Sequence, residues 1–178
     1  MKNLIGTRTD QNLRNAFSGE SEAAMKYSFY SYIARKEGYE QIADIFQETA
    51  DNEHEHAEIW FEELGGLSNT RDNLYAAAAG ERYEWSDMYA GFAVTAREEG
   101  FSDLALKFEQ IAQIEREHEA RYNKLIENIE NNRVFSKPEK IRWICKHCGF
   151  SFEGTDAPEN CPVCNSPKAY FEEKAENY

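Results

Sequence analysis

Apolar side chains recur at spacings of three and four from about residue 12 to residue 131, a pattern that predicts helices. The same stretch is rich in Ala, Glu, Arg, Gln and Leu, which favour helical backbone. Gly38 and Gly100 each end an Ala-Arg-x-Glu-Gly run and predict helix ends, and Gly65-Gly66 predicts another. Residues 67–79 are expected to form a connection with at most a short helical turn. The pattern therefore predicts four helices.

An internal repeat predicts how these helices are arranged. When the sequence is laid on itself at a shift of 62, residues 34–57 align with residues 96–119 without a gap, and ten of the 24 positions are identical. Such self-similarity predicts one helical hairpin used twice, and two hairpins packed together make a four-helix bundle. The 13-residue connection reaches roughly 40 Å when extended, which suits a crossover along the length of the bundle.

The repeat carries two motifs of metal-ligand type. Glu53-x-x-His56 and Glu115-x-x-His118 occupy equivalent positions, and a spacing of three puts both side chains of each motif on one face of a helix. A single motif of this kind in an acidic helical protein is typical of a solvated face. Two copies at equivalent positions of a repeat favour a metal site.

Further carboxylates lie at a matching depth in the predicted hairpins. Glu53 follows Gly38 at the same interval as Glu115 follows Gly100, and a similar count backwards from each glycine reaches Glu residues on the preceding helix. In antiparallel hairpins such residues lie at the same level, about 23–28 Å from the turn. The candidate ligands are Glu20, Glu53, His56, Glu81, Glu84, Glu115 and His118.

Carboxylates converging in the core of a bundle require cations, because unpaired buried charge is prohibitive. Two divalent ions supply that charge and accept oxygen and imidazole ligands together. A Glu from each of two helices plus Glu-x-x-His from each of the other two is the pattern of ferritin-like di-iron proteins. The rival interpretation places the acids on the surface, but it leaves their shared depth unexplained. His54 is expected to face solvent.

The four cysteines predict a separate, smaller metal domain. They form two pairs, Cys145-x-x-Cys148 and Cys161-x-x-Cys164, with residues 149–160 between the pairs. Four thiolates favour a tetrahedral zinc or iron ion, and their spacing leaves that choice open. His147 is expected to be a loop residue. A domain of about 40 residues cannot fold on a core alone, so the ion is expected to be structural as well.

The sequence around the cysteines resembles rubredoxin, in which one iron carries single electrons: Cys-x-x-Cys-Gly-Phe150 is followed by Cys-Pro-Val-Cys164. The whole chain resembles the rubrerythrin family, a ferritin-like bundle (here residues 1–137) followed by a rubredoxin-like domain (138–178). The seven candidate bundle ligands and the four cysteines carry this resemblance. Residues 89–100 and 132–135 are also similar to the family.

The resemblance implies a function: reduction of hydrogen peroxide to water at a di-iron site, with electrons relayed by the rubredoxin-like iron, in protection against oxidative stress. It implies that Tyr27 and Tyr89 donate hydrogen bonds to ligand carboxylates. The expected partners are a redox donor protein, either a rubredoxin or an NAD(P)H-dependent reductase, and a second copy in a head-to-tail homodimer. The alternative is a ferroxidase or iron store whose cysteine-bearing C-terminal part forms a zinc ribbon, and zinc is a possible substitute for the thiolate-bound iron.

Composition limits the partners and the compartment. The formal net charge of -13 argues against nucleic acid and anionic membranes, which both need clustered Lys and Arg. The first ten residues contain no apolar stretch, and no run of about 18 apolar residues occurs anywhere. We therefore expect a cytoplasmic protein.

Overall fold

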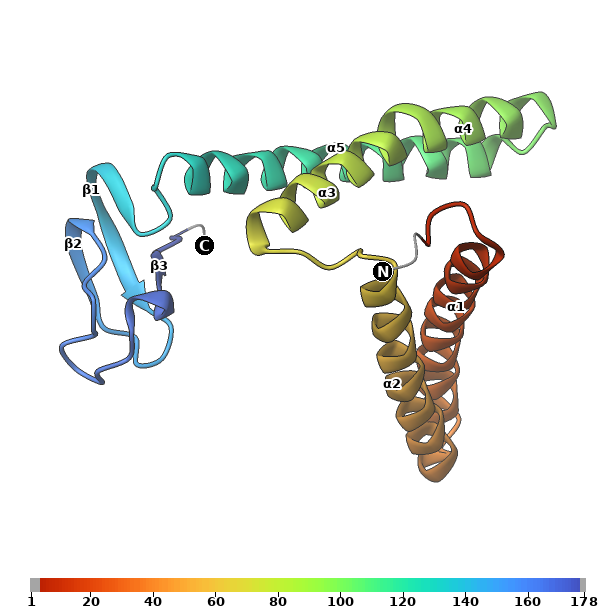
Figure 1. The fold of residues 1–178 in the computed structure, drawn as a ribbon, viewed down its shortest axis with the longest axis horizontal. Coiled ribbons are helices and arrows are strands. Elements are labelled where there is room, and N and C mark those ends of the chain that lie inside the picture. The colour runs from red at the N-terminus through yellow and green to blue at the C-terminus, as the bar shows by residue number, and fades with distance from the viewer. Residues whose placement is uncertain (1–3, 177–178) are drawn as a thin grey trace. The chain divides into compact units, whose positions relative to one another are not determined.

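The first part of the chain is one antiparallel helical hairpin. The structure, a computed structural model, describes residues 4–176, and its internal contacts divide the chain into two units after Asn69. In the first unit, α1 (Arg8–Lys36) packs along α2 (Glu40–Glu63), and we call this pair the first hairpin (Figure 1). The hydroxyl of Ser31 donates to the carbonyl of Ala43 at 2.8 Å and ties the two helices together near their turn.

The second unit begins with a long helical rod that changes its winding in the middle. The rod consists of α3 (Thr70–Tyr83), the π-helical turn η1 (Glu84–Met88), which we call the π segment, and α4 (Tyr89–Glu98). It packs along α5 (Ser102–Glu130), and together they form the second hairpin (Figure 1).

The expected connection over residues 67–79 is wrong, because helix begins at Thr70. The run Ala76–Ala79 has high helix propensity and extends the rod backwards. Only residues 64–69 are non-helical between the two hairpins, so the predicted 13-residue crossover is not present.

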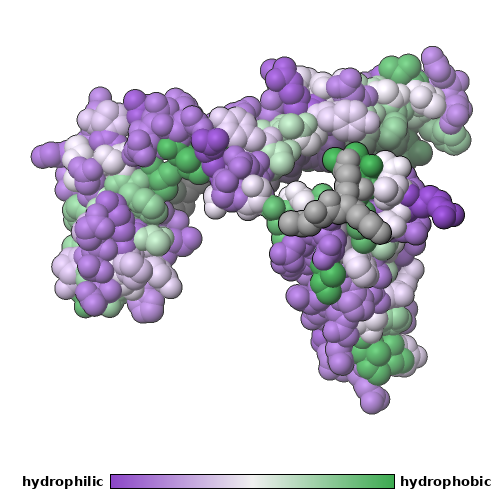
Figure 2. Space-filling view, viewed as in Figure 1, coloured by the Kyte–Doolittle hydropathy of each residue, from purple (hydrophilic) through white to green (hydrophobic). Residues whose placement is uncertain are grey.

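The two hairpins share their internal packing. In the first, the rings of Tyr30 and Phe46 lie 5.6 Å apart, and in the second their repeat partners Phe92 and Phe108 lie 5.6 Å apart. Each hairpin has an apolar hollow beside its turn, of about 470 Å³ and 500 Å³, and the residues that line the two hollows correspond one to one at a shift of 62. Figure 2 shows apolar surface at the turn of the first hairpin. The predicted repeat is therefore confirmed in three dimensions.

The C-terminal region is a small antiparallel sheet. Its strands are β1 (Ser136–Cys145), β2 (Ser151–Asp156) and β3 (Phe171–Glu173), in the order β2-β1-β3. Trp143 is fully buried at its centre and donates its indole N–H to the carbonyl of Gly154 at 3.0 Å. The predicted fold class is confirmed: within residues 4–176 the chain is mainly α, with four long helical elements (α1, α2, the rod and α5), followed by a small domain that carries the cysteines. The boundary after residue 137 stays a prediction.

No helix within residues 4–176 is long and apolar enough to cross a membrane.

Candidate metal centres

The first hairpin brings three of the predicted ligands together. Ligand atoms of Glu20 on α1 and of Glu53 and His56 on α2 all lie within 4.8 Å of one another, and we call these residues the first cluster. His56 Nδ1 lies 2.8 Å from Glu53 Oε2. A hydrogen bond with Glu53 and partial desolvation raise the pKa of Glu20, while the His56 ring holds the pKa of Glu53 below its usual value.

The second hairpin repeats this arrangement. Glu81 on α3 and Glu115 and His118 on α5 have ligand atoms within 4.8 Å of one another and form the second cluster. His118 Nδ1 lies 2.7 Å from Glu115 Oε2 and 3.6 Å from Glu81 Oε2. Burial, followed by the neighbouring Glu115, raises the pKa of Glu81.

Glu84 opens the π segment, one turn beyond Glu81. It does not belong to the compact trio, but its charge adds to the raised pKa of Glu81. It also acts on Tyr89: burial, then the charges of Glu115 and Glu84, raise the pKa of that phenol. Glu84 therefore lies close enough to the second cluster for its charge to raise the pKa of a residue in that cluster.

The donor sets fit iron. Each cluster offers two carboxylates and one imidazole, and this mixture of oxygen and nitrogen donors suits non-haem iron. The pKa of Glu20 is raised mainly by the hydrogen bond with Glu53 and that of Glu81 mainly by burial, and repulsion from the neighbouring carboxylate adds to both. A cation at each cluster would relieve this repulsion.

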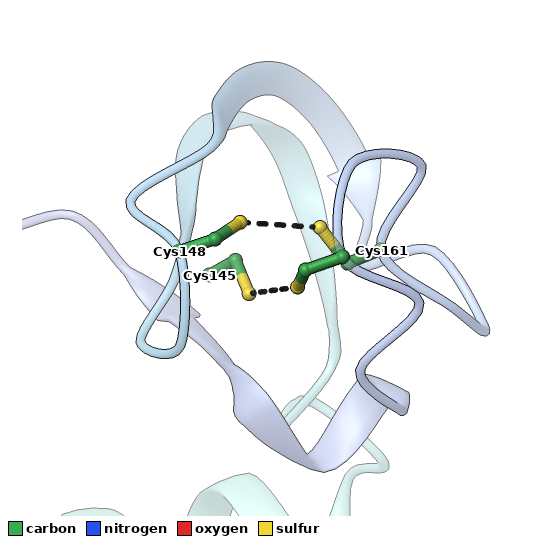
Figure 3. Close-up of side chains that lie close together, drawn as sticks. Cys145, Cys148 and Cys161 are labelled. Atoms are coloured by element: carbon green, nitrogen blue, oxygen red, sulfur yellow. Dashed lines mark hydrogen bonds between the residues drawn. The ribbon is translucent and has the colours of Figure 1, made fainter.

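The four cysteines form a third site with the dimensions of a metal tetrahedron. Cys145 Sγ lies 3.8 Å from Cys164 Sγ, and Cys148 Sγ lies 3.6 Å from Cys161 Sγ (Figure 3). Sulfurs at about 2.3 Å from one ion, at the corners of a tetrahedron, are separated by about 3.8 Å. All four cysteines are free thiols in the structure, and the sulfur separations far exceed a disulfide bond of about 2.05 Å.

The thiols differ in acidity. A backbone hydrogen bond from Phe150 favours the Cys148 thiolate, but desolvation and the three neighbouring sulfurs outweigh it and raise the pKa of Cys148 to about 12. Hydrogen bonds from the side chain and backbone of Ser166 lower the pKa of Cys164 to about 6. A metal ion must therefore displace protons from this site, most of all from Cys148.

The remaining candidates lie apart from these sites. His54 is exposed, as expected, and its neighbours Glu55 and Glu58 are exposed acids of a solvated face. His147 is an exposed residue between the first two cysteines, and its ring lies 5.9 Å from that of Tyr170. Tyr27 packs against Phe46 at 6.3 Å, and the predicted hydrogen bonds from Tyr27 and Tyr89 to ligand carboxylates stay predictions.

Sequence reasoning missed the π segment and the contact that flanks it. Trp85 donates its indole N–H to Glu119 Oε2 at 2.6 Å, between the π segment and the helix that carries Glu115 and His118. A signal was present, because the spacing between repeat partners changes at this point of the second hairpin.

Fold and sites together define a helical metalloprotein with paired carboxylate–histidine clusters and a tetrathiolate domain. The family model "Rubrerythrin" matches residues 11–126 and again residues 72–143, and the model "Rubrerythrin, rubredoxin-like domain" matches residues 143–172. The chain belongs to the rubrerythrin family, which is a family of oxidoreductases. Family membership and the clusters together indicate an iron protein.

Similar proteins span the whole chain. Rubrerythrin-1 of Clostridium acetobutylicum is 50% identical over an alignment of 195 positions that covers 100% of both chains. The rubrerythrin of Porphyromonas gingivalis is 45% identical over 99% of this chain and 95% of its own. The rubrerythrin of Nitratidesulfovibrio vulgaris is 44% identical over 97% of each chain.

Proposed function

We propose that this protein is a non-haem iron peroxidase that reduces hydrogen peroxide to water and protects the cell against oxidative stress. The observation that carries the proposal is the duplicated carboxylate–histidine cluster, found with a tetrathiolate site in one chain of the rubrerythrin family. The two clusters supply the ligands of two iron ions, and the cysteines hold a third iron.

The duplicated glutamates take the central role among the ligands. Glu53 and Glu115 are repeat partners, and in this proposal each would hold both ions through its carboxylate. In the same proposal, His56 and Glu84 would be alternative ligands of one of the two ions. The carboxylate is favoured by the harder ferric ion, and the neutral imidazole by the ferrous ion.

The reaction consumes two electrons and two protons for each peroxide: H2O2 + 2 e⁻ + 2 H⁺ gives 2 H2O. When bound, the two ferrous ions supply the electrons that break the O–O bond. The two protons come from solvent, and Tyr89 is suited to act as a hydrogen-bond donor, because the pKa of its phenol is raised by burial and by Glu115 and Glu84. Its Oη therefore keeps its proton and can donate it as a hydrogen bond beside the site.

Electrons reach the site one at a time through the four-cysteine domain. Between His118 and Glu130, α5 rises by about 18 Å along its axis, and the chain then continues to the cysteines. Fast electron transfer favours a shorter distance than this, so we propose a head-to-tail homodimer in which the cysteine site of one subunit serves the iron ions of the other. A rubredoxin or an NAD(P)H-dependent reductase refills the cysteine site.

The function is tested with purified protein expressed in iron-rich medium. Elemental analysis should find three iron ions per chain, and the oxidised protein should be red, because ferric tetrathiolate is coloured and zinc is not. Rapid mixing of the fully reduced protein with peroxide under anaerobic conditions should oxidise it within one turnover. A colourless protein that stores iron but reacts slowly with peroxide would instead be the ferroxidase with a zinc ribbon.

The dimer is tested by mixing two inactive variants, Glu53→Ala and Cys161→Ala. After dissociation and reassociation, mixed dimers retain one complete pair of sites across subunits, so about a quarter to a half of the wild-type activity per dimer should return. If mass spectrometry shows mixed dimers and the mixture is as inactive as its parents, transfer between subunits is refuted.

A further inference from the structure

The π segment marks a one-residue insertion in the second copy of the repeat. After the segment, repeat partners differ by 62 in sequence position, and before it they differ by 61. A π turn holds one residue more than an α turn, so it absorbs the insertion without disturbing the flanking helix. The partners at a shift of 61 include Asn12/Asn73, Leu13/Leu74, Gly19/Gly80 and Glu20/Glu81, and those at 62 include Tyr27/Tyr89, Arg35/Arg97 and Gly38/Gly100.

Two side chains beside the insertion differ between the hairpins. Trp85 and Glu119 correspond to Ala24 and Ala57 of the first hairpin at these shifts. The two alanines line an apolar hollow of about 400 Å³. In the second hairpin the indole of Trp85 instead donates to the Glu119 carboxylate at 2.6 Å. The pair therefore occurs in the hairpin that has the insertion, and both its members are absent from the hairpin that lacks it.

Glu119 is itself held in place. Its side chain is 14% exposed, and Arg82 Nη1 lies 3.9 Å from its Oε1. The amide of Asn123 donates to the same oxygen at 3.4 Å. On the other side of the pair, the guanidinium of Arg116 lies 5.6 Å from the ring centre of Trp85. A hydrogen bond to a carboxylate is stronger than one between neutral groups, so the hydrogen bond between Trp85 and Glu119, which we call the tie, holds the two helical segments together strongly.

The position of this tie connects it to the metal ligands. Trp85 directly follows Glu84, and Glu119 directly follows His118. Within the π segment the N–H of Tyr89 reaches back five residues to the carbonyl of Glu84, a poorer arrangement than the α-helical one. The backbone that carries Glu84 is therefore less well stabilised than regular α-helix, and a contact with a neighbouring helix would hold it in place.

We propose that Trp85 and Glu119 are positioning residues for Glu84: their hydrogen bond anchors the π segment to α5 and so sets where the Glu84 carboxylate stands. The inference rests on the proposed function, in which Glu84 is an iron ligand. The hydrogen bond joins two protein side chains, so it can be tested separately from the ligand role.

The first measurement is amide hydrogen exchange of residues 84–88 in the metal-free, full-length protein. Loss of a charge-assisted hydrogen bond in Trp85→Phe should speed this exchange about tenfold. Glu119→Gln keeps an oxygen that accepts the indole N–H and should change exchange by less than about threefold. Trp60→Phe is the matched control, because the buried indole N–H of Trp60 has no hydrogen-bond partner among residues 4–176. It should leave exchange in the π segment unchanged.

The second measurement is the visible spectrum of Co²⁺ bound to the clusters, with the cysteine site first filled by one equivalent of Zn²⁺. Glu84→Ala should alter the Co²⁺ bands by removing a ligand. Trp85→Phe should alter them in the same direction by displacing that ligand. Glu119→Gln should keep the wild-type bands, and so should Trp60→Phe. A merely structural role would not reproduce the spectral signature of the ligand variant.

The outcomes separate the two ideas. If Glu84→Ala alters the spectrum but Trp85→Phe leaves both spectrum and exchange at wild-type values, the anchor is overturned and the ligand role stands. If Glu84→Ala itself leaves the spectrum unchanged, Glu84 is not a ligand, and the positioning role fails with it. The proposal is supported if Trp85→Phe shows faster exchange and an altered spectrum while Glu119→Gln stays close to wild type in both.

Discussion

The two hairpins are copies of one design with one local difference. Both present a Glu opposite Glu-x-x-His and pack the same aromatic pair near the turn. The first hairpin is regular helix and leaves an apolar hollow beside Ala24 and Ala57. The second has one more residue, which forms a π turn, and it has the carboxylate of Glu84 where the first has Ala23. It also has Trp85 where the first has Ala24, a residue that lines the hollow. Duplication thus accounts for two similar clusters, and a single insertion makes them unequal.

This inequality suits redox chemistry. An ion that changes charge during turnover needs a ligand set that can change with it, and a strictly symmetric pair of clusters offers none. π turns are frequent at functional sites because their backbone can adapt at little cost. If Glu84 is an iron ligand, as in the proposed function, the second hairpin carries the adaptable ligand, while the residues of the two clusters lie on regular helix.

The largest expected effect tests what the hairpins share. Glu53→Ala and Glu115→Ala each remove a carboxylate that, in the proposed function, would hold both ions, so each should lower peroxide turnover at least a hundredfold, more than the usual cost of disturbing an outer partner of a metal ligand. Stopped-flow kinetics of the reduced variants measures this.

The matched controls are Glu55→Ala and Glu117→Ala, which are repeat partners on the exposed face of the same helices. They should retain wild-type turnover, and all four variants should keep the red cysteine site. Unequal losses for Glu53→Ala and Glu115→Ala, by more than about tenfold, would contradict equivalent bridging roles.

The second prediction removes the difference between the hairpins. Deleting Asp87 takes one residue out of the π segment and gives Glu81 and Tyr89 the same separation along the chain as Glu20 and Tyr27. A regular helix should form, and the recovered backbone hydrogen bond should raise the melting temperature by about 2–4 °C. Turnover should fall several-fold, because Glu84 loses its adaptable backbone.

The control for this deletion lies in the first hairpin. Deleting Lys26 from α1 removes a residue that a regular helix requires and turns everything before it by about 100° around the axis. It should destabilise the protein strongly. A deletion of Asp87 that is equally destabilising would show that the π turn is not a simple insertion.

Local sequence patterns identified most of the residues that cluster in the structure, but they did not predict where the helical backbone is irregular. Gly38 and Gly100 have positive φ at the hairpin turns, and the glutamate–histidine motifs lie where the repeat placed them, since helix geometry alone brings residues three apart to one face. The spacing of the cysteines likewise predicted that their four thiols lie together, because two Cys-x-x-Cys pairs are typical of a single metal ion with four thiolate ligands.

The start of α3 at Thr70 and the π turn were missed for different reasons. The alanine run in α3 has a high helix propensity. The prediction of a connection over residues 67–79 gave this propensity too little weight. The π turn escaped because periodicity arguments assume about 3.6 residues per turn throughout. A shift of 61 compared with 62 across residues 81–89 was the available signal. The contact of Trp85 with Glu119 spans 34 positions and depends on helix pairing, so no local pattern contains it.

The smallest expected effect compares the acids of the two clusters in metal-free protein. The pKa of Glu20 is raised above its usual 4.5, mainly by the hydrogen bond with Glu53, and that of Glu81 is raised mainly by burial. A carboxyl with a raised pKa stabilises the folded state fully below about pH 4.5, and this contribution is lost as pH rises through the raised pKa. Glu20→Gln and Glu81→Gln remain neutral and avoid this loss.

The melting temperature of each variant, measured by circular dichroism after treatment with chelator, should therefore rise relative to that of wild type by about 1–2 °C between pH 4.5 and pH 7. With Fe²⁺ added anaerobically the order should reverse at pH 7, because a neutral amide is a poorer iron ligand than a carboxylate. If the variants lose stability relative to wild type as pH rises in the absence of metal, the pKa values of Glu20 and Glu81 are not raised in the folded protein, and the electrostatic argument for a cation at each cluster fails.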